Sequence, residues 1–144
     1  MQLVRLIYVS RMTEECDMAA LQDILKTARR KNRRLDVSGA LCYDPAFFMQ
    51  CLEGPREHVN LLYMVIARDP RHTNVTLLEY ADVKHRVFGD WSMAFLNAGD
   101  IDKQTLKKYS GRGRFNPYRL NAKQAREFLI EVVGQKRGAM PDRD

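Results

Sequence analysis

A few polar side chains interrupt runs of apolar residues that are predicted to form strands. Gln50 is the strongly polar residue within FFMQCL (47–52), and Tyr8 and Ser10 share one face of LVRLIYVS (3–10) at period 2. A buried carboxamide needs hydrogen-bond partners and costs a few kcal/mol without them. A phenol and a carboxamide on adjacent strands can together bind a planar heterocycle, or they can satisfy each other in the core. On the residues alone the second interpretation is at least as good.

Signatures of catalytic and metal sites are missing from the sequence. It contains no Ser-His-Asp signature, no HExxH, no P-loop and no GxGxxG, so we expect no enzyme. The histidines His58, His72 and His85 are scattered and lack the spacing of a metal site, so no metal is expected. His72 is set apart from the others because it follows Arg71, and an Arg-His pair in a loop could contact a phosphate.

The elements that must position these residues follow from hydrophobic periodicity and turn signals. Strands are predicted at 3–10, 37–43, 47–52, 75–83 and 91–96, and helices at about 18–31 and 55–68. The order β-α-β-β-α-β-β predicts an α+β, ferredoxin-like sandwich with one sheet and two helices on one face. The first and third strands are central neighbours in such a sheet, so Tyr8 and Gln50 are expected to meet on the face toward the helices. Asn32 lies at the end of the first helix, and Trp91, Ser92 and Met93 lie on the fifth strand.

The composition changes near Asn97, which divides the chain into three parts. We expect a domain over 1–97, a helical extension over 98–134 and a disordered tail over 135–144. The extension should contain helices at about 101–109 and 122–133. Such an appendage packs back on its domain or meets a partner.

Length and charge limit the functional classes. The chain of 144 residues is long enough for one domain with a real core, and its formal net charge is +6. Its basic stretches, of which 29–34 is the densest, are read as solvated helix ends rather than as a nucleic-acid surface. Absence of a membrane-length apolar run or signal peptide, together with three unclustered cysteines, predicts a cytoplasmic protein.

An RNA-binding domain with the same order of elements would alternate basic and aromatic residues on its third strand. The stretch FFMQCLEG (47–54) lacks that alternation. Nucleic acid is therefore not expected as a partner.

Residues 3–96 resemble BLUF domains, the blue-light sensors that use flavin. The similarity rests on RLIYVS with Tyr8, KNRRLDVSGALCY with Asn32 and Gly39, FMQCLEG with Gln50, DPRH with His72, and DWSM with Trp91 and Met93. These short motifs occur in the family's order and at its spacing. LKKYSGRGRFNP in the extension resembles the tail of short single-domain BLUF photoreceptors, so we expect no effector enzyme to follow.

The resemblance implies a non-covalently bound flavin between the two helices, FAD with FMN as the alternative. Tyr8 would donate an electron and a proton to the excited flavin, Gln50 would bridge the phenol and the flavin's N5 and O4 edge, and Asn32 would bind its O4 and N3 region. Ser10, Trp91 and Met93 would relay the signal, one of the last two lying near Gln50. Arg71 and His72 would contact the ribityl chain or phosphate.

Two departures from the family concern residues that bind the flavin and its phosphate. Lys31 stands where relatives often carry Asn or His, and Val65 where some carry a phosphate-binding Arg. The expected function is a blue-light photoreceptor that is a homo-oligomer and signals to a partner protein through the fifth strand and the C-terminal helices. The alternatives are a flavin-dependent redox enzyme and a non-flavin nucleic-acid-binding or structural module.

Overall fold

The computed structural model describes residues 2–111 and 113–136. In chain order the elements are β1 (Leu3–Met12), α1 (Met18–Arg34), β2 (Ser38–Tyr43), β3 (Phe47–Pro55), α2 (Arg56–Arg68), β4 (His72–Asp82), β5 (Ala94–Asn97), α3 (Lys103–Ser110) and α4 (Ala122–Gln135), with short 3-10 helices at Ala98–Asp100 and Pro117–Arg119. This is the β-α-β-β-α-β-β order predicted from the sequence, followed by the two expected C-terminal helices.

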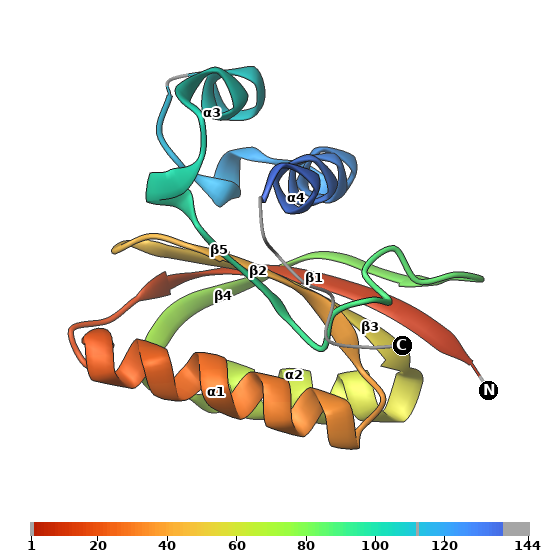
Figure 1. Cartoon of the computed structure of the whole chain (residues 1–144). Coiled ribbons are helices and arrows are strands. Elements are labelled where there is room, and N and C mark those ends of the chain that lie inside the picture. The colour runs from red at the N-terminus through yellow and green to blue at the C-terminus, as the bar shows by residue number, and fades with distance from the viewer. Residues whose placement is uncertain (1, 112, 137–144) are drawn as a thin grey trace.

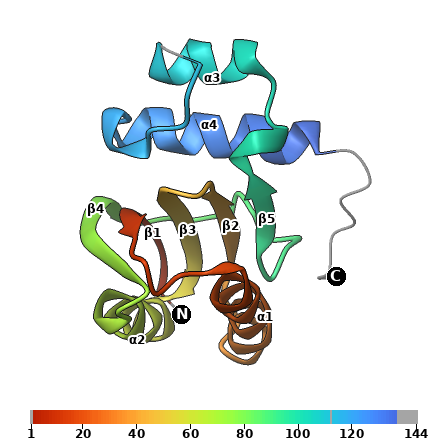
Figure 2. The same ribbon diagram turned by 90° about the vertical axis from the view of Figure 1, so that its left-hand side faces the viewer.

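The strands form one sheet in the order β4-β1-β3-β2-β5. The central pair, β1 and β3, is antiparallel, whereas β2 and β5 run parallel. Helices α1 and α2 cover one face of the sheet (Figure 1), as predicted. Helix α4 lies against the other face, with α3 beyond it (Figure 2), so the extension packs back on the domain.

Both faces of the central strands are buried, which explains why their sequences are nearly continuous apolar runs. In β1, Leu6 and Tyr8 belong to the cluster under α1 and α2, while Ile7 and Val9 belong to the cluster under α4. Helix α4 contributes to the second cluster the buried residues Ala125, Phe128, Leu129, Val132 and Val133. The domain therefore has two apolar cores separated by one sheet.

Local capping fixes where the long helices begin. The Asp17 carboxylate accepts a hydrogen bond of 2.8 Å from the Ala20 amide at the start of α1. Helix α1 extends to Arg34, beyond its predicted end, and its last turn carries three basic residues that suit the negative end of the helix dipole. Asn121 and Gln124 form a capping box at the start of α4, which continues to Gln135.

The predicted bounds of the outer strands were wrong. The fifth strand begins at Ala94, so Trp91, Ser92 and Met93 precede it rather than lie on it. The reason is that the carbonyl of Ser92 is bound by a helix side chain and not by a strand, as described below. The fourth strand begins earlier than predicted, at His72. Most of the expected disordered tail, residues 137–144, lies outside the described residues.

Within the described residues, none of the helices combines the length and apolar character that crossing a membrane requires.

Gly39 is a point of close approach in the sheet. A Cβ there would lie 1.9 Å from the Cys51 carbonyl oxygen and 3.2 Å from Met93 Cε. We predict that Gly39→Ala lowers the free energy of unfolding by about 3 kcal/mol, since neither the backbone nor the core can yield freely. Urea denaturation of the full chain measures this.

Gly134 in α4 is the matched control, because a Cβ there meets nothing within 4 Å. Gly134→Ala should stabilise the protein by about 0.5–1 kcal/mol through helix propensity. Equal stability of the two variants would contradict the close packing of β2 against β3.

Candidate functional site

Tyr8 and Gln50 lie directly opposite each other on β1 and β3. The Tyr8 phenol donates a hydrogen bond of 2.6 Å to the Gln50 side-chain oxygen, and both residues are buried. The carboxamide nitrogen of Gln50 is 3.7 Å from Met93 Sδ, which is a weak acceptor. Gln50 is thus held strongly through its oxygen and only weakly through its nitrogen.

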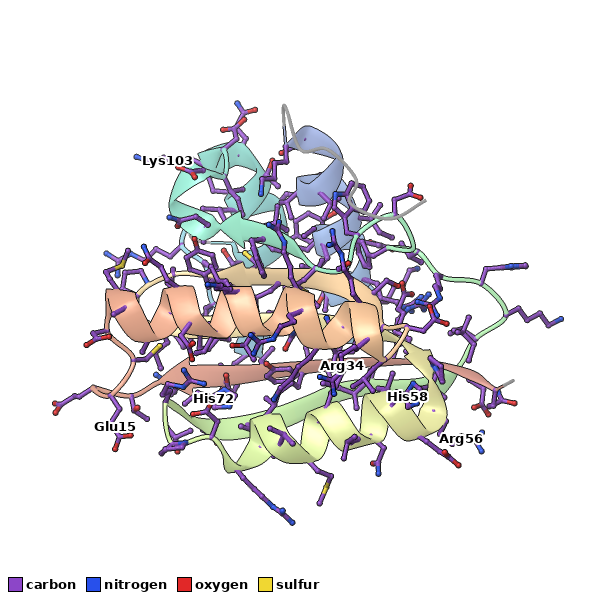
Figure 3. The ribbon with its side chains drawn as sticks, turned by 60° about the horizontal axis from the view of Figure 1, so that its bottom comes forward. Glu15, Arg34, Arg56, His58, His72 and Lys103 are labelled. Atoms are coloured by element: carbon purple, nitrogen blue, oxygen red, sulfur yellow. The ribbon has the colours of Figure 1, made fainter. Side chains whose placement is uncertain are left out.

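A cavity opens between α1 and α2 above this pair. Figure 3 looks onto this face, with His72 at one end of the helix pair and His58 at the other. The walls of the cavity are mostly apolar and are formed by Ile24, Ala28, Leu41, Phe48, Leu52, Leu62, Val65 and Ile66. Its polar lining comprises Tyr8, Thr27, Lys31, Asn32, Gln50, Asp69, Arg71 and His72. Apolar walls with a few convergent polar groups are typical of cofactor sites.

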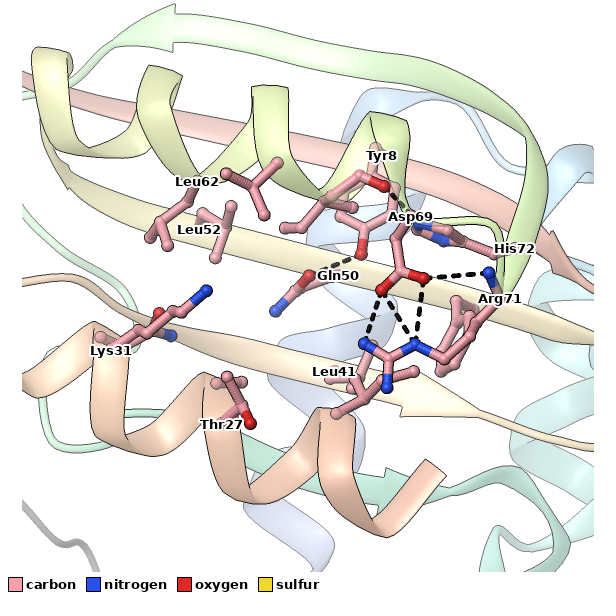
Figure 4. Close-up of a pocket in the computed structure, with 16 residues that line it drawn as sticks. Tyr8, Thr27, Lys31, Leu41, Gln50, Leu52, Leu62, Asp69, Arg71 and His72 are labelled. Atoms are coloured by element: carbon pink, nitrogen blue, oxygen red, sulfur yellow. Dashed lines mark hydrogen bonds and ion pairs between the residues drawn. The ribbon is translucent and has the colours of Figure 1, made fainter. Parts of the chain in front are cut away.

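The close-up in Figure 4 shows that the Gln50 nitrogen points away from Tyr8, into the space on the side of α1. Asn32 is buried and also lines the cavity. Its carboxamide nitrogen donates a hydrogen bond of 2.9 Å to the Ser92 carbonyl, and no described residue donates to its oxygen. The site therefore presents a weakly satisfied donor, Gln50, and an acceptor, Asn32, to a molecule in the cavity.

Arg71 reaches the cavity, but its guanidinium is bound to two carboxylates. It contacts Asp69 at 2.6 Å and Asp23 at 3.0 Å. Hydrogen bonding to Asp69 raises the pKa of Arg71, and hydrogen bonding to Arg71 lowers the pKa of Asp69. An anionic group at this end of the cavity must compete with Asp69 for Arg71. Lys31, across the cavity on α1, is a second cation at its lining.

His72, the first residue of β4, packs against Tyr8 and is itself held by two hydrogen bonds. Its Nε2 lies 2.5 Å from the Ile66 carbonyl and its Nδ1 lies 2.9 Å from the Ser10 hydroxyl. Because a carbonyl only accepts, Nε2 carries a hydrogen, and in the neutral ring Ser10 donates to Nδ1. The His72 ring also packs edge-on against Tyr8, with centroids 6.1 Å apart. Ser10 was expected beside Tyr8. The contacts of His72 with both residues were not predicted from the sequence.

Met93 and Trp91 lie on opposite faces of the sheet. Met93 is fully buried in the cluster under α1 and α2, beside Gln50, whereas Trp91 packs against the cluster under α4. Of the two predicted relay residues, Met93 is the one that contacts Gln50.

Sequence reasoning also missed the contacts of two arginines in the basic stretch 29–34. Arg29 Nε donates to the Met93 carbonyl at 3.3 Å, and Arg33 Nε lies 3.2 Å from the Ser92 hydroxyl. Both arginines are exposed, as the interpretation of solvated helix ends expected, but each also contacts the segment before β5. The signal was available: residues 29, 32 and 33 share one helical face.

Burial controls the protonation of the buried groups. Desolvation, with smaller contributions from Tyr63 and Asp69, raises the pKa of Tyr8 well above its ordinary value. Tyr8 is therefore a neutral phenol that donates to Gln50. Burial likewise raises the pKa of Cys51, so this thiol is protonated and unreactive. Among the described residues no cluster of His, Cys, Asp and Glu could hold a metal ion.

The chain is similar to known proteins in both sequence and fold. A family model described as "BLUF: Sensors of blue-light using FAD" matches residues 3–94. The photoactivated adenylate cyclase subunit beta of Euglena longa is 39% identical over 93 residues, which cover 63% of this chain and 11% of that protein. The blue light- and temperature-regulated antirepressor BluF of Escherichia coli (strain K12) is 36% identical over 84 residues, 57% of this chain and 21% of that protein. The chain thus spans only a small part of these relatives.

Solved structures match over nearly the whole chain. The photo-activated state of BlsA superposes with a TM-score of 0.84 and 33% identity, covering 96% of this chain and 99% of that one. The dark state of BlrB, described as a BLUF protein, has a TM-score of 0.76 and 27% identity, covering 93% of this chain and 96% of that one.

The raised pKa of Tyr8 predicts a pH dependence of stability. Above about pH 10 the unfolded phenol loses its proton whereas the folded one keeps it. The free energy of unfolding of the wild type should therefore fall, relative to Tyr8→Phe, by about 1.4 kcal/mol per pH unit. Urea denaturation of both proteins at several alkaline pH values measures the difference. A difference that stays constant with pH would show that Tyr8 is not desolvated.

Proposed function

The chain belongs to the BLUF family of blue-light sensors that use FAD, and on that premise we propose that it is a photoreceptor whose switch is the Tyr8–Gln50 hydrogen bond. The observation that carries the proposal is the 2.6 Å bond itself, buried at the base of the cavity. Members of the family bind FAD or FMN.

The cavity suits a flavin ring. Its walls are mostly apolar, Gln50 and Asn32 line it, and the Gln50 nitrogen points into it. We assign the ring's polar edge to Gln50 and Asn32, and the ribityl chain or phosphate to Arg71, His72 and Lys31. Of these, His72 would have to exchange Ser10 or the Ile66 carbonyl for the ligand. A bound flavin supplies absorption of blue light and, once excited, a strong oxidant.

Tyr8 is the proposed donor of the electron and the proton. Its phenol is neutral in the resting state because burial raises its pKa. Its proton already lies in a short hydrogen bond to the Gln50 oxygen, so it has a defined path. Oxidation of a phenol makes it strongly acidic, and the proton then leaves along this bond.

Gln50 converts that proton movement into a changed pattern of donors and acceptors. It rotates or changes tautomer, and after the electron and proton return to Tyr8 it offers the cavity a new hydrogen bond. Such a change is worth about 0.5–1.5 kcal/mol net, and more in a dry site. That shifts a two-state element several-fold. Met93 contacts the Gln50 nitrogen and is the first residue to respond.

The output is proposed to be non-enzymatic. The chain matches single-domain structures over almost its full length, whereas other relatives join the same domain to an adenylate cyclase. We therefore propose that β5 and the C-terminal helices signal to a partner protein, and that the protein self-associates. The alternative, a flavin-dependent redox enzyme, is distinguished by whether NAD(P)H bleaches the bound flavin.

The proposal predicts a yellow protein with a small, reversible red shift of its flavin absorption under blue light. Tyr8→Phe and Gln50→Leu should each retain flavin and lose the red shift, since one lacks the phenolic proton and the other the carboxamide. Absorption spectra before and after illumination measure both properties.

Tyr63→Phe is the matched control. The Tyr63 ring lies beside Tyr8, with centroids 5.9 Å apart, but its phenol does not bond Gln50. It should keep the red shift. A normal photocycle in flavin-loaded Tyr8→Phe or Gln50→Leu would refute the roles assigned to these residues.

A further inference from the structure

The segment that carries Met93 is bound to α1 by three side chains. Asn32 donates to the Ser92 carbonyl at 2.9 Å, Arg33 lies 3.2 Å from the Ser92 hydroxyl, and Arg29 donates to the Met93 carbonyl at 3.3 Å. These side chains share one face of α1 at spacings of three and four residues. The position of Met93 beside Gln50 is therefore set from the helix as well as from the sheet.

Arg29 has a second contact that reaches β5. Its guanidinium carbon lies 4.4 Å from the centroid of the Phe95 ring, within the range of a cation–π interaction. The planar guanidinium thus binds Met93 through its backbone and Phe95 through its ring. Movement of Met93 changes the geometry of both contacts together.

Phe95 is in turn bound by the end of α4. Lys136, the residue directly after this helix, donates a hydrogen bond from its ammonium to the Phe95 carbonyl. Strand β5 is an outer strand of the sheet, so Lys136 joins α4 to the sheet's edge. Arg29 and Lys136 thus both contact Phe95, one at its ring and the other at its carbonyl. Burial, and next the nearby charge of Arg29, lowers the pKa of Lys136.

We propose that Arg29 is a positioning residue that couples Gln50 and Met93 to α4 through Phe95 and Lys136. This inference rests on the proposed function and names the residues of its output. When Met93 leaves Gln50, Arg29 cannot keep both of its contacts, Phe95 shifts, and Lys136 loses its acceptor. The end of α4 then opens from the sheet edge.

The test is hydrogen–deuterium exchange of the full, FAD-loaded chain in the dark and under blue light. In the wild type, light should speed amide exchange in the last turns of α4, residues 129–135. Arg29→Gln should reduce this light-induced increase about threefold, as expected for the loss of one cation–π contact and one hydrogen bond. It should keep the flavin red shift.

Arg30→Gln is the matched control, because Arg30 is exposed like Arg29 but its side chain makes no hydrogen bond or ion pair with the described residues. It should behave as the wild type. Lys136→Gln should reproduce the effect of Arg29→Gln, and the double variant should lose no more than either single variant, since both act in one chain of contacts. In the flavin-free protein, Arg29→Gln should also speed exchange over residues 92–97.

The possible results distinguish a failure of the proposed function from a failure of the Arg29 coupling. If the wild type shows no red shift, the proposed function fails. If the wild type shows the red shift and a light-dependent α4 that Arg29→Gln leaves unchanged, the coupling is refuted and the photoreceptor stands. The coupling would also be overturned if the double variant lost more of the light-induced increase than either single variant. It would likewise be overturned if amide exchange in α4 of the wild type did not change with light.

Discussion

The hydrogen bond between Tyr8 and Gln50 depends on the register of two central strands. A slip of one residue between β1 and β3 would turn Gln50 to the opposite face of the sheet, toward α4. The register is set by apolar residues on both faces, such as Leu6 and Leu52 under the helices and Ile7 and Cys51 under α4. A polar pair at the centre of a two-core domain is thus positioned by its apolar neighbours.

The same sheet separates the cavity from the C-terminal helices, so the proposed signal needs a segment that contacts both sides of the sheet. We propose the segment before β5 as that route, because Met93 packs on the side of Gln50 while Trp91 packs toward α4. A buried ion pair holds the start of this segment: Glu53 binds Arg5 at 3.0 Å and accepts the amides of Val87 and Phe88. The segment is thus held by Glu53 near its start and bound to α1 at Ser92 and Met93.

The fold and the centre of the site were predictable from the sequence, because Tyr8 and Gln50 are polar residues at inward positions of neighbouring apolar strands. The face of the sheet on which Met93 packs and the first residue of β5 could not be predicted. DWSM has no alternating pattern, and its backbone is bound by Asn32, a residue of α1. The exposed Arg29 was read as solvated because the shared helical face does not tell which groups it meets, the Met93 carbonyl and the Phe95 ring. Arg71 lines the cavity, but its ion pairs with Asp69 and Asp23 could not be predicted, because Asp23 lies on another element.

The central claim is that light changes the bonding of the Gln50 carboxamide. The most direct measurement is a light-minus-dark infrared difference spectrum of the FAD-loaded protein with isotope-labelled glutamine side chains. The account predicts a label-sensitive change in a glutamine carbonyl band that accompanies the red shift and disappears in Gln50→Leu. A full red shift with no change in any glutamine band would contradict it.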